Sequence, residues 1–324
     1  QPYTLFDSQA RYAPDAAYSY QTSGLGTTNY NTYQSSVSLN VSATVATPIS
    51  TAAAQTYRVF PYQPGKSLLT LQTFSMAGFQ ANLQQRVGYF NTNNGVYFSQ
   101  IGSTLFFNIR TFAGSAVGGG GSVTETSIPQ ATWNGDKLDG TGPSGITIDV
   151  KKTQILFLDF EWLGVGSVRC GFVINNVFIT CHTFYNANVQ NVVYMQTAIL
   201  PLRYEITTTG TIAGVRTLQQ ICSTVISEGG YEQTSQPFVA RSTTPFTLTT
   251  SGTFYPLLSI RLNASYLGAV VLPAIVGMVA TSGTGTFEVA LVKNATLTGA
   301  TWASSISGGQ VDVDTAATTM VAPT

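Results

Sequence analysis

The chain has 324 residues and no formal net charge, because 14 Lys and Arg residues balance 14 Asp and Glu residues. Only 9% of the residues are charged, far below the roughly 25% of ordinary soluble domains. Lys and Arg form no run or stripe, which argues against nucleic-acid binding through a basic surface. A hydrophobic content of 44% excludes intrinsic disorder.

The longest apolar stretch, residues 267–280, is interrupted by Gly268, Pro273 and Gly277. It is too short and too broken to span a bilayer, so we predict no membrane insertion. The chain begins at Gln1 and no signal-peptide pattern follows. We therefore expect this end to be processed or excerpted.

Residues 1–56 are predicted to form an extended N-terminal arm. This segment is rich in Gln, Ser, Thr, Asn, Tyr and Ala and has few aliphatic runs. One amphipathic strand is indicated where apolar residues alternate with Ser and Asn over residues 37–45. Without a core of its own, the arm is expected to become ordered by packing on a neighbour and to serve as an anchor.

Residues 57–212 predict an all-β domain, an antiparallel β-sandwich or jelly roll. Many strand patterns follow one another with short turns and almost no helical periodicity. The expected strands cover residues 67–74, 85–89, 96–100, 104–110, 145–150, 154–163, 168–174, 177–183 and 203–208.

Residues 213–230 are predicted to be a linker, and residues 231–324 a second, smaller β domain. Apolar residues in the linker fit both helical and strand spacing, so its structure stays open. In the second domain, strand patterns cover residues 246–250, 254–262, 269–272, 275–281, 285–293 and 300–305.

Three strands between residues 154 and 183 predict a meander whose register can be derived. Asn175-Asn176 is a two-residue hairpin loop, and Gly164 to Gly166 is a three-residue loop. The first loop places Cys170 opposite Cys181 on an apolar face. The second places Glu161 opposite Arg169 on the other face, which His182 shares.

Cys170 and Cys181 are predicted to be buried free thiols. A hydrogen-bonded antiparallel pair has its Cα atoms about 5.5 Å apart, and this distance permits a disulfide. Both residues belong to an apolar face, however, where a free cysteine behaves as a small hydrophobe.

Asp159 and Glu161 lie two residues apart on one predicted strand and therefore share a face. Paired carboxylates can hydrolyse a glycosidic bond, so a jelly-roll glycoside hydrolase is a rival hypothesis. Because Arg169 is expected opposite Glu161, we favour a structural or interfacial row made of Asp159, Glu161, Arg169 and His182. We predict no catalytic, cofactor-binding or metal-binding residues.

Two other groups have alternative interpretations. Asp136, Asp139 and Asp149 lie among glycines and offer oxygen ligands for Ca²⁺, but their spacing fits turn-forming Asp better. A set of aromatic residues resembles either a sugar platform or strand core, and we favour core. This set is Tyr89, Phe90, Tyr97, Phe98, Phe106 and Phe107.

Several segments resemble a structural module of tailed-phage virions, notably of phages that infect aquatic cyanobacteria. They are WNGDKLDGTGPSG, TQILFLDFEWLGVGSVRCGFVI, CHTFYNAN, VYMQTAILPLRYEI, CSTVISEGG and SIRLNASYLGAVVLPAIVGMVATSGTGTFEVALVKNATLTGATW. The resemblance covers roughly residues 85 to 305.

The resemblance implies a non-enzymatic virion protein, such as a capsid decoration, a fibre or a similar appendage. It also implies a homotrimer attached through the N-terminal arm and in contact with capsid or tail proteins of the virion. Binding of a host-surface glycan by a tail fibre is the alternative within this class.

Overall fold

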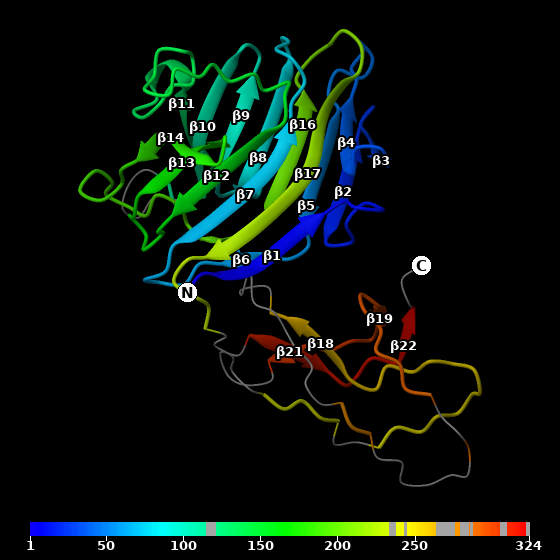
Figure 1. The fold of residues 1–324 in the computed structure, drawn as a ribbon. Coiled ribbons are helices and arrows are strands. Elements are labelled where there is room, and N and C mark those ends of the chain that lie inside the picture. The colour runs from blue at the N-terminus through cyan, green and yellow to red at the C-terminus, as the bar shows by residue number, and fades with distance from the viewer. Residues whose placement is uncertain are drawn as a thin grey trace. The chain divides into compact units, whose positions relative to one another are not determined.

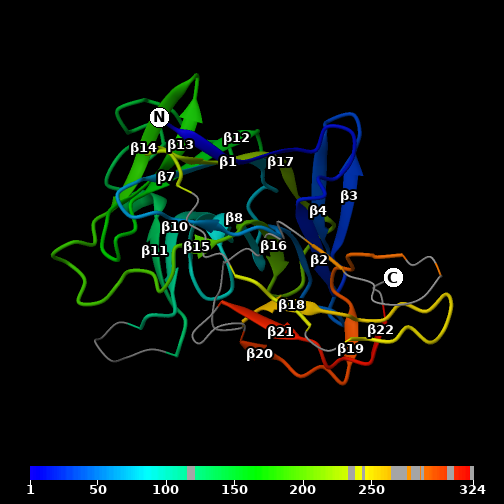
Figure 2. The same cartoon turned by 90° about the horizontal axis from the view of Figure 1, so that it is seen from below.

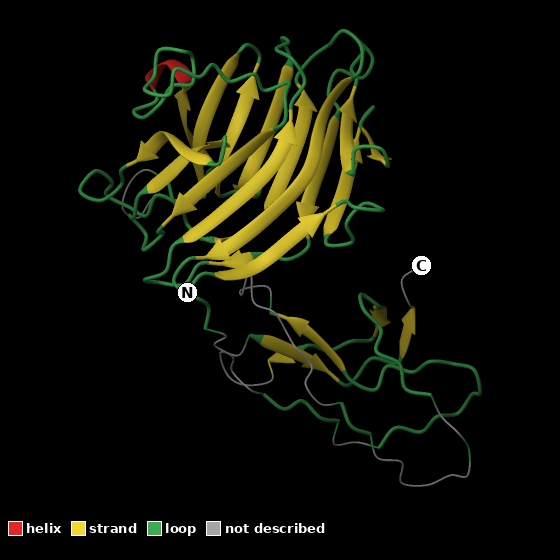
Figure 3. Ribbon diagram, in the orientation of Figure 1, coloured by secondary structure: helices red, strands yellow, loops and turns green. Residues whose placement is uncertain are grey.

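The computed structural model describes residues 1–114, 121–232, 238–242, 245–263, 276–278, 285, 288–304 and 310–321. The chain divides into two compact units, Gln1–Glu232 and Gln233–Thr324. The predicted second domain begins at residue 231, two residues from this division. Strands and loops dominate both units, and the one helix among the described residues is the short 3-10 helix η1, Gln130–Thr132 (Figure 3).

The first unit is an antiparallel β-sandwich of jelly-roll type (Figure 1). Its eight-stranded sheet has the order β14-β13-β12-β7-β17-β4-β3, and β1 pairs with a further part of β17. The strands of this sheet are β1 (Tyr3–Gln9), β3 (Thr27–Asn31), β4 (Ser36–Val41), β7 (Leu68–Ser75), β12 (Gln154–Phe160), β13 (Val168–Ile174), β14 (Val177–Phe184) and β17 (Arg216–Ser227).

The second layer is a seven-stranded sheet with the order β11-β10-β9-β8-β16-β5-β2. Its strands are β2 (Tyr18–Ser23), β5 (Thr51–Thr56), β8 (Leu83–Phe90), β9 (Gly95–Ile101), β10 (Thr104–Thr111), β11 (Thr124–Pro129) and β16 (Leu202–Thr208). A two-stranded ribbon joins β6 (Phe60–Pro61) to β15 (Ile199–Leu200). Figure 2 separates the layers, with β12 and β13 in one and β10 and β16 in the other.

Aromatic rings from both sheets fill the core. Phe98 of the seven-stranded sheet packs on Phe172 of the eight-stranded sheet, with ring centroids 5.1 Å apart. Tyr89 and Phe160 meet across the sheets at the same distance. All four are at most 1% exposed. Full burial of one large apolar side chain contributes about 1.5–3 kcal/mol, so these residues hold the layers together.

The predicted N-terminal arm is wrong. Residues 1–56 form β1 to β5 and contribute to both sheets. Alternation indicated only β4, whose inward Val37, Leu39 and Val41 are buried, whereas β5 is hidden in the sequence because its inward residues are small. Ala52 and Ala54 of β5, both fully buried, lie beside Ile206 and Tyr204 of β16, whose larger side chains fill the space.

The predicted linker is also wrong, since residues 216–227 form β17, the longest strand. It pairs with β1, β4 and β7. A register shift between Gln220 and Ser223 interrupts its alternation, and both of these polar side chains are buried. This irregularity explains why the apolar spacing looked partly helical. The first domain therefore covers residues 1–232 rather than 57–212.

Residues 145–150 were predicted to be a strand, but they form an irregular segment with one isolated bridge from Asp139 to Thr147. A strand that was not predicted, β11, pairs with β10 in this part of the fold. This segment turns instead of extending because Gly142 and Pro143 precede it and Gly145 begins it, and because Asp136 accepts a hydrogen bond from the backbone N–H of Ser144.

In the second unit, β18 (Ser259–Leu262) and β20 (Ala303–Ser304) both pair with β21 (Val311–Asp314). A second ribbon joins β19 (Thr296–Thr298) to β22 (Thr319–Val321). The predicted strands 254–262 and 300–305 correspond in part to β18 and β20, whereas 246–250 is loop. The predictions for 269–272 and most of 275–281 lie outside the described residues, and residues 288–293 are loop.

Candidate functional site

The predicted lateral row does not form as expected, because Arg169 pairs with Asp159 and not with Glu161. Asp159 lies directly opposite Arg169 between β12 and β13, and their side chains form an ion pair. The connection between the two strands spans residues 161–167, longer than the three-residue loop predicted. The geometry of this loop depends on Leu163, whose φ lies in the left-handed region, and on the hydrogen bond that the Gly166 N–H donates to the Trp162 carbonyl.

The longer loop shifts the register by two residues, so the faces were assigned correctly although the partners were not. Asp159 is buried and its pKa is raised, mainly by desolvation, while Arg169 opposes the rise. Glu161 follows the end of β12. One carboxylate of the suggested hydrolase pair is therefore held by a guanidinium, and the other lies outside the strand.

A bulge at the β13–β14 pairing changes the expected partner of Cys170. Cys170 lies opposite His182, and Cys181 is the extra residue. Both thiols are fully buried and unbridged. His182 is buried because the loop after Trp133 covers this edge of the sheet, and the backbone N–H of Asn134 donates to its Nδ1 at 3.3 Å.

The three aspartates suggested for Ca²⁺ cap turns. Asp136 accepts hydrogen bonds from the backbone N–H groups of Leu138 and Ser144, at 2.9 and 2.7 Å. Asp139 and Asp149 each accept from the backbone two residues ahead. Within the described part of the chain, no three His, Cys, Asp or Glu side chains gather to hold a metal ion.

The aromatic set divides between the two faces of the seven-stranded sheet. Tyr89, Phe98 and Phe107 point into the core, as favoured. Phe90, Tyr97 and Phe106 are their neighbours in sequence and therefore point to the outer face. That outer face carries three of the nine arginines of the chain, and we call it the arginine face. Its central residues are Arg86, Phe90, Tyr97, Arg110, Glu125, Arg203 and Glu205.

Arg110 is the centre of one half of the arginine face. Its guanidinium carbon lies 5.0 Å from the ring centroid of Tyr97 and 5.8 Å from that of Phe90. The same group donates to Glu125 Oε2 at 3.0 Å and to the Tyr97 hydroxyl at 2.9 Å. A guanidinium that both stacks on rings and forms directional hydrogen bonds is rigidly held.

Arg86 and Arg203 form the other half, together with Glu205. The carboxylate of Glu205 accepts from Arg86 Nη1 at 2.8 Å and from Arg203 Nη2 at 2.6 Å. Burial alone would raise the pKa of Glu205, but the two guanidinium groups and their hydrogen bonds lower it. Glu205 therefore stays ionised, which suits it to orienting donors and not to donating a proton.

Unused hydrogen-bonding capacity lies beside these ion pairs. Asn108 donates to Ser99 Oγ at 2.8 Å, but its Oδ1 has no partner among the described residues. The Nε of Arg86 is likewise buried and unpartnered there. Buried polar atoms without partners are costly, so water or a polar ligand is expected to satisfy them.

The arginine face combines fixed donors and fixed acceptors on the outer side of the sheet, where the charged side chains are 12–28% exposed and cover the buried rings of Phe90 and Tyr97. Such a combination suits a polar ligand with many hydroxyl groups, because few groups are free to reorganise on binding. The arginine face is not recognisable in the sequence, because each arginine stands alone in its strand. The available signal was the alternation of Gln84, Arg86, Gly88 and Phe90, which leaves two bulky polar groups on one face.

No protein-family model and no curated protein matches the chain. Solved structures with a similar fold include an endo-acting O-glycanase of human gut microbiota, at 10% identity, covering 69% of this chain and 99% of that one with a TM-score of 0.46. A glycosyl hydrolase family 16 protein from Mycobacterium smegmatis shares 8% identity, with coverages of 69% and 100% and a TM-score of 0.43.

The CBM2 module of the evolved Dit of Lactobacillus casei BL23 phage J-1 shares 7% identity, with coverages of 71% and 98% and a TM-score of 0.43. At such identities and TM-scores, these similarities assign no function to the chain. Among the residues that the structure describes, no helix is long and apolar enough to cross a membrane.

Proposed function

We propose that the protein is a non-enzymatic structural protein of a tailed-phage virion, a decoration, fibre or similar appendage, whose sandwich binds a host-surface glycan. The arginine face is the observation that carries the binding role. The virion assignment rests on the sequence resemblance described above. Attachment through residues 1–56 is withdrawn, because these residues build the sandwich.

The glycan role follows from the chemistry of the arginine face. Arg86, Arg110 and Arg203 are each held by a carboxylate, so their remaining N–H groups point in fixed directions. A sugar presents both hydroxyl donors and hydroxyl acceptors, so its hydroxyl groups can replace ordered waters while reproducing the hydrogen bonds of those waters. Phe106, at the partly exposed edge of this face, offers an apolar surface to a sugar ring.

Glycan binding is tested with the purified full chain on an array of host-surface polysaccharides. Phe106→Ala and Arg203→Lys are expected to weaken binding at least tenfold while circular dichroism shows that the fold is intact. Thr73→Ala, on the outer face of the eight-stranded sheet, is the matched control. Equal loss in the control, or no wild-type binding at millimolar concentration, contradicts the glycan role.

The virion assignment has its own test. Antibodies against the purified chain are expected to label intact phage particles in electron micrographs, and light scattering of the purified chain is expected to show a homotrimer. Particles that carry no label contradict the assignment, and a monomer contradicts the trimer alone.

Hydrolysis through Asp159 and Glu161 is the rival function. The ion pair of Asp159 with Arg169 counts against it. Incubation with the bound polysaccharide is expected to release no reducing ends. Release that disappears in Asp159→Asn, with the fold intact, overturns the non-enzymatic proposal.

A further inference from the structure

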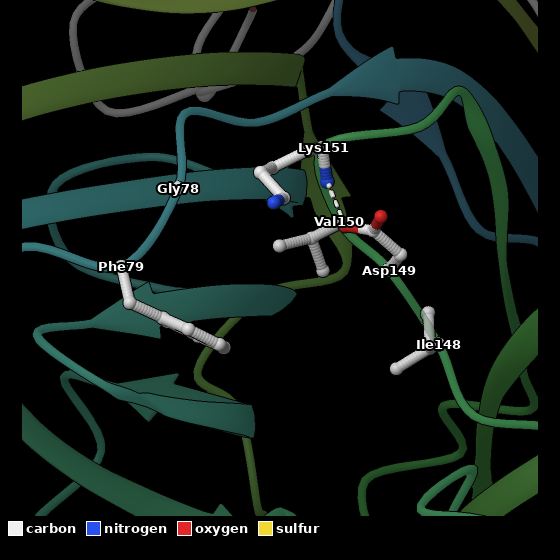
Figure 4. A pocket seen from close by; sticks show the side chains of 6 residues that line it. All are labelled: Gly78, Phe79, Ile148, Asp149, Val150 and Lys151. Carbon is white, nitrogen blue, oxygen red and sulfur yellow. Dashed lines mark hydrogen bonds between the residues drawn. The ribbon is translucent and has the colours of Figure 1, made fainter.

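A pocket of about 260 Å³ lies beside the loop between β7 and β8 and shares no lining residue with the arginine face (Figure 4). The β7–β8 loop supplies one wall, and the segment before β12 supplies the other. Its lining residues are Gly78, Phe79, Ile148, Asp149, Val150 and Lys151. Ligand pockets for drug-sized molecules are about 300–1,000 Å³, so this volume suits one small ring.

Phe79 is the prominent feature of this pocket. Its side chain is 56% exposed although it is a large apolar group. Phe79 also lines a second hollow of about 310 Å³, together with Gln80, Ala81, Gly102 and Ser103. The ring therefore borders two hollows, which gives a ligand of more than one sugar unit room to extend.

Both walls are fixed at their bases. The Met76 N–H donates to Val150 O at 2.7 Å, which ties the β7–β8 loop to the opposite wall. The fully buried Gln85 accepts from the Ala77 N–H at 2.9 Å and donates to the Ala77 carbonyl at 3.2 Å. The loop that carries Phe79 is thus held in place before any ligand arrives, and binding costs little ordering entropy.

Lys151 gives the pocket its charge. Its stem approaches Gly78, where an added Cβ would lie 3.4 Å from Lys151 Cδ, and Figure 4 shows its amine directed toward the pocket. No ion pair to Lys151 occurs among the described residues. Asp149 uses one oxygen for the backbone N–H of Lys151, at 3.1 Å, and no ion pair joins it to the Lys151 ammonium group, so this positive charge is available to a ligand.

We infer that this pocket binds an acidic pyranose, a sugar ring that carries a carboxylate. The apolar face of the ring stacks on Phe79, and the ammonium group of Lys151 pairs with the carboxylate. The stacked ring covers exposed apolar area, worth roughly 25 cal/mol per Å², and the charge pair selects acidic sugars over neutral ones. This site is separate from the arginine face and does not depend on the glycan role proposed for it.

The test is calorimetric titration of the full chain with trigalacturonate, with maltotriose as the neutral probe. Trigalacturonate is expected to bind at least tenfold more tightly than maltotriose. Phe79→Ala and Lys151→Gln are each expected to weaken trigalacturonate binding at least tenfold. The matched controls are Lys152→Gln, which removes a neighbouring charge outside the pocket lining, and Tyr33→Ala, which removes an aromatic side chain that is 99% exposed.

Three outcomes overturn the inference. They are an absence of trigalacturonate binding at millimolar concentration, equal affinity for maltotriose, and an equal loss in either control variant. Phe106→Ala separates this site from the arginine face: it is expected to leave trigalacturonate affinity unchanged, and a loss there places the ligand on the arginine face. Unfolding temperatures of all variants show that the fold is intact.

Discussion

Gly88 of β8 lies directly opposite Tyr97 of β9, and the two strands approach so closely there that no side chain fits at residue 88. A Cβ added to Gly88 would lie 2.6 Å from both the Cα and the Cβ of Tyr97. Gly95 and Phe90 repeat the arrangement in the same strand pair, with 2.1 Å to the Cβ of Phe90. The two glycines thus allow the rings of Phe90 and Tyr97 to lie 4.6 Å apart beneath Arg110.

Gly88→Ala is expected to destabilise the sandwich. The added methyl group meets backbone atoms that cannot turn away, and overpacking of this kind costs about 1–3 kcal/mol. Urea unfolding measures the change in the free energy of unfolding. Gly78→Ala is the control, because its Cβ makes only an ordinary contact with a flexible lysine stem. Equal stability of the two variants contradicts the close approach.

Arg110→Met is expected to lower the free energy of unfolding by about 1–2 kcal/mol. It removes cation–π contacts with two rings, worth about 0.5–1 kcal/mol each at exposed sites, and the partly exposed pair with Glu125. Arg110→Lys is expected to recover only part of this loss, since an ammonium lacks the planar fork. Near-UV circular dichroism reports the change around Tyr97. Arg11→Met, at an exposed position, should leave both measurements unchanged.

Glu205 is expected to make stability depend on acid pH. Its folded pKa lies below the ordinary value of 4.5, so the unfolded chain takes up the proton first as pH falls. The contribution of Glu205 is complete above pH 4.5 and is lost as pH falls through the folded pKa. Glu205→Gln should have a lower free energy of unfolding at pH 7, and below pH 5 this free energy should depend less on pH. Asp7→Asn, at an exposed position, serves as the control. If the free energy of unfolding of Glu205→Gln changes with pH in parallel with that of the wild type, Glu205 is not the group responsible.

His182 is the only histidine of the chain, so one imidazole signal should be followed easily by NMR. Burial lowers its pKa from the ordinary 6.5, because a charged ring would lose hydration and the hydrogen bond from Asn134. The unfolded chain is then protonated first, and stability declines as pH falls below 6.5. A titration midpoint at or above 6.5 would show that the ring is open to water.

Cys170 and Cys181 are expected to resist thiol reagents in the native state. Both are fully buried, and burial raises the pKa of each thiol. Ellman's reagent should therefore modify them only after guanidinium unfolding, when three thiols react. Cys222→Ser removes the partly exposed thiol and should leave almost no native reactivity. Two unreactive thiols after unfolding without a reductant would instead reveal a disulfide.

Much of the central fold can be predicted from local sequence. The Asn175-Asn176 turn has both residues at left-handed φ, as a two-residue hairpin loop requires. It sets Phe172 opposite Ile179, which is the register on which the predicted pairing of Cys170 with Cys181 rested. Register farther along the strands was predicted wrongly, because a bulge at Cys181 and a seven-residue loop after Phe160 leave no simple mark in the sequence. Alternation still identified the faces of β12 and β13, since a shift of two residues preserves them. The prediction that His182 shares the face of Arg169 is wrong, because the one-residue bulge places His182 opposite Cys170.

Composition and alternation by themselves determined that this protein is an antiparallel β structure with a distinct second unit. They could not show that residues 1–56 and 216–227 complete the two sheets, because strand pairing between distant segments depends on backbone hydrogen bonds and complementary side-chain volumes. The arginine face is likewise a tertiary product. Arg86, Arg110 and Arg203 come from three strands and meet only because sheet formation places them on one side.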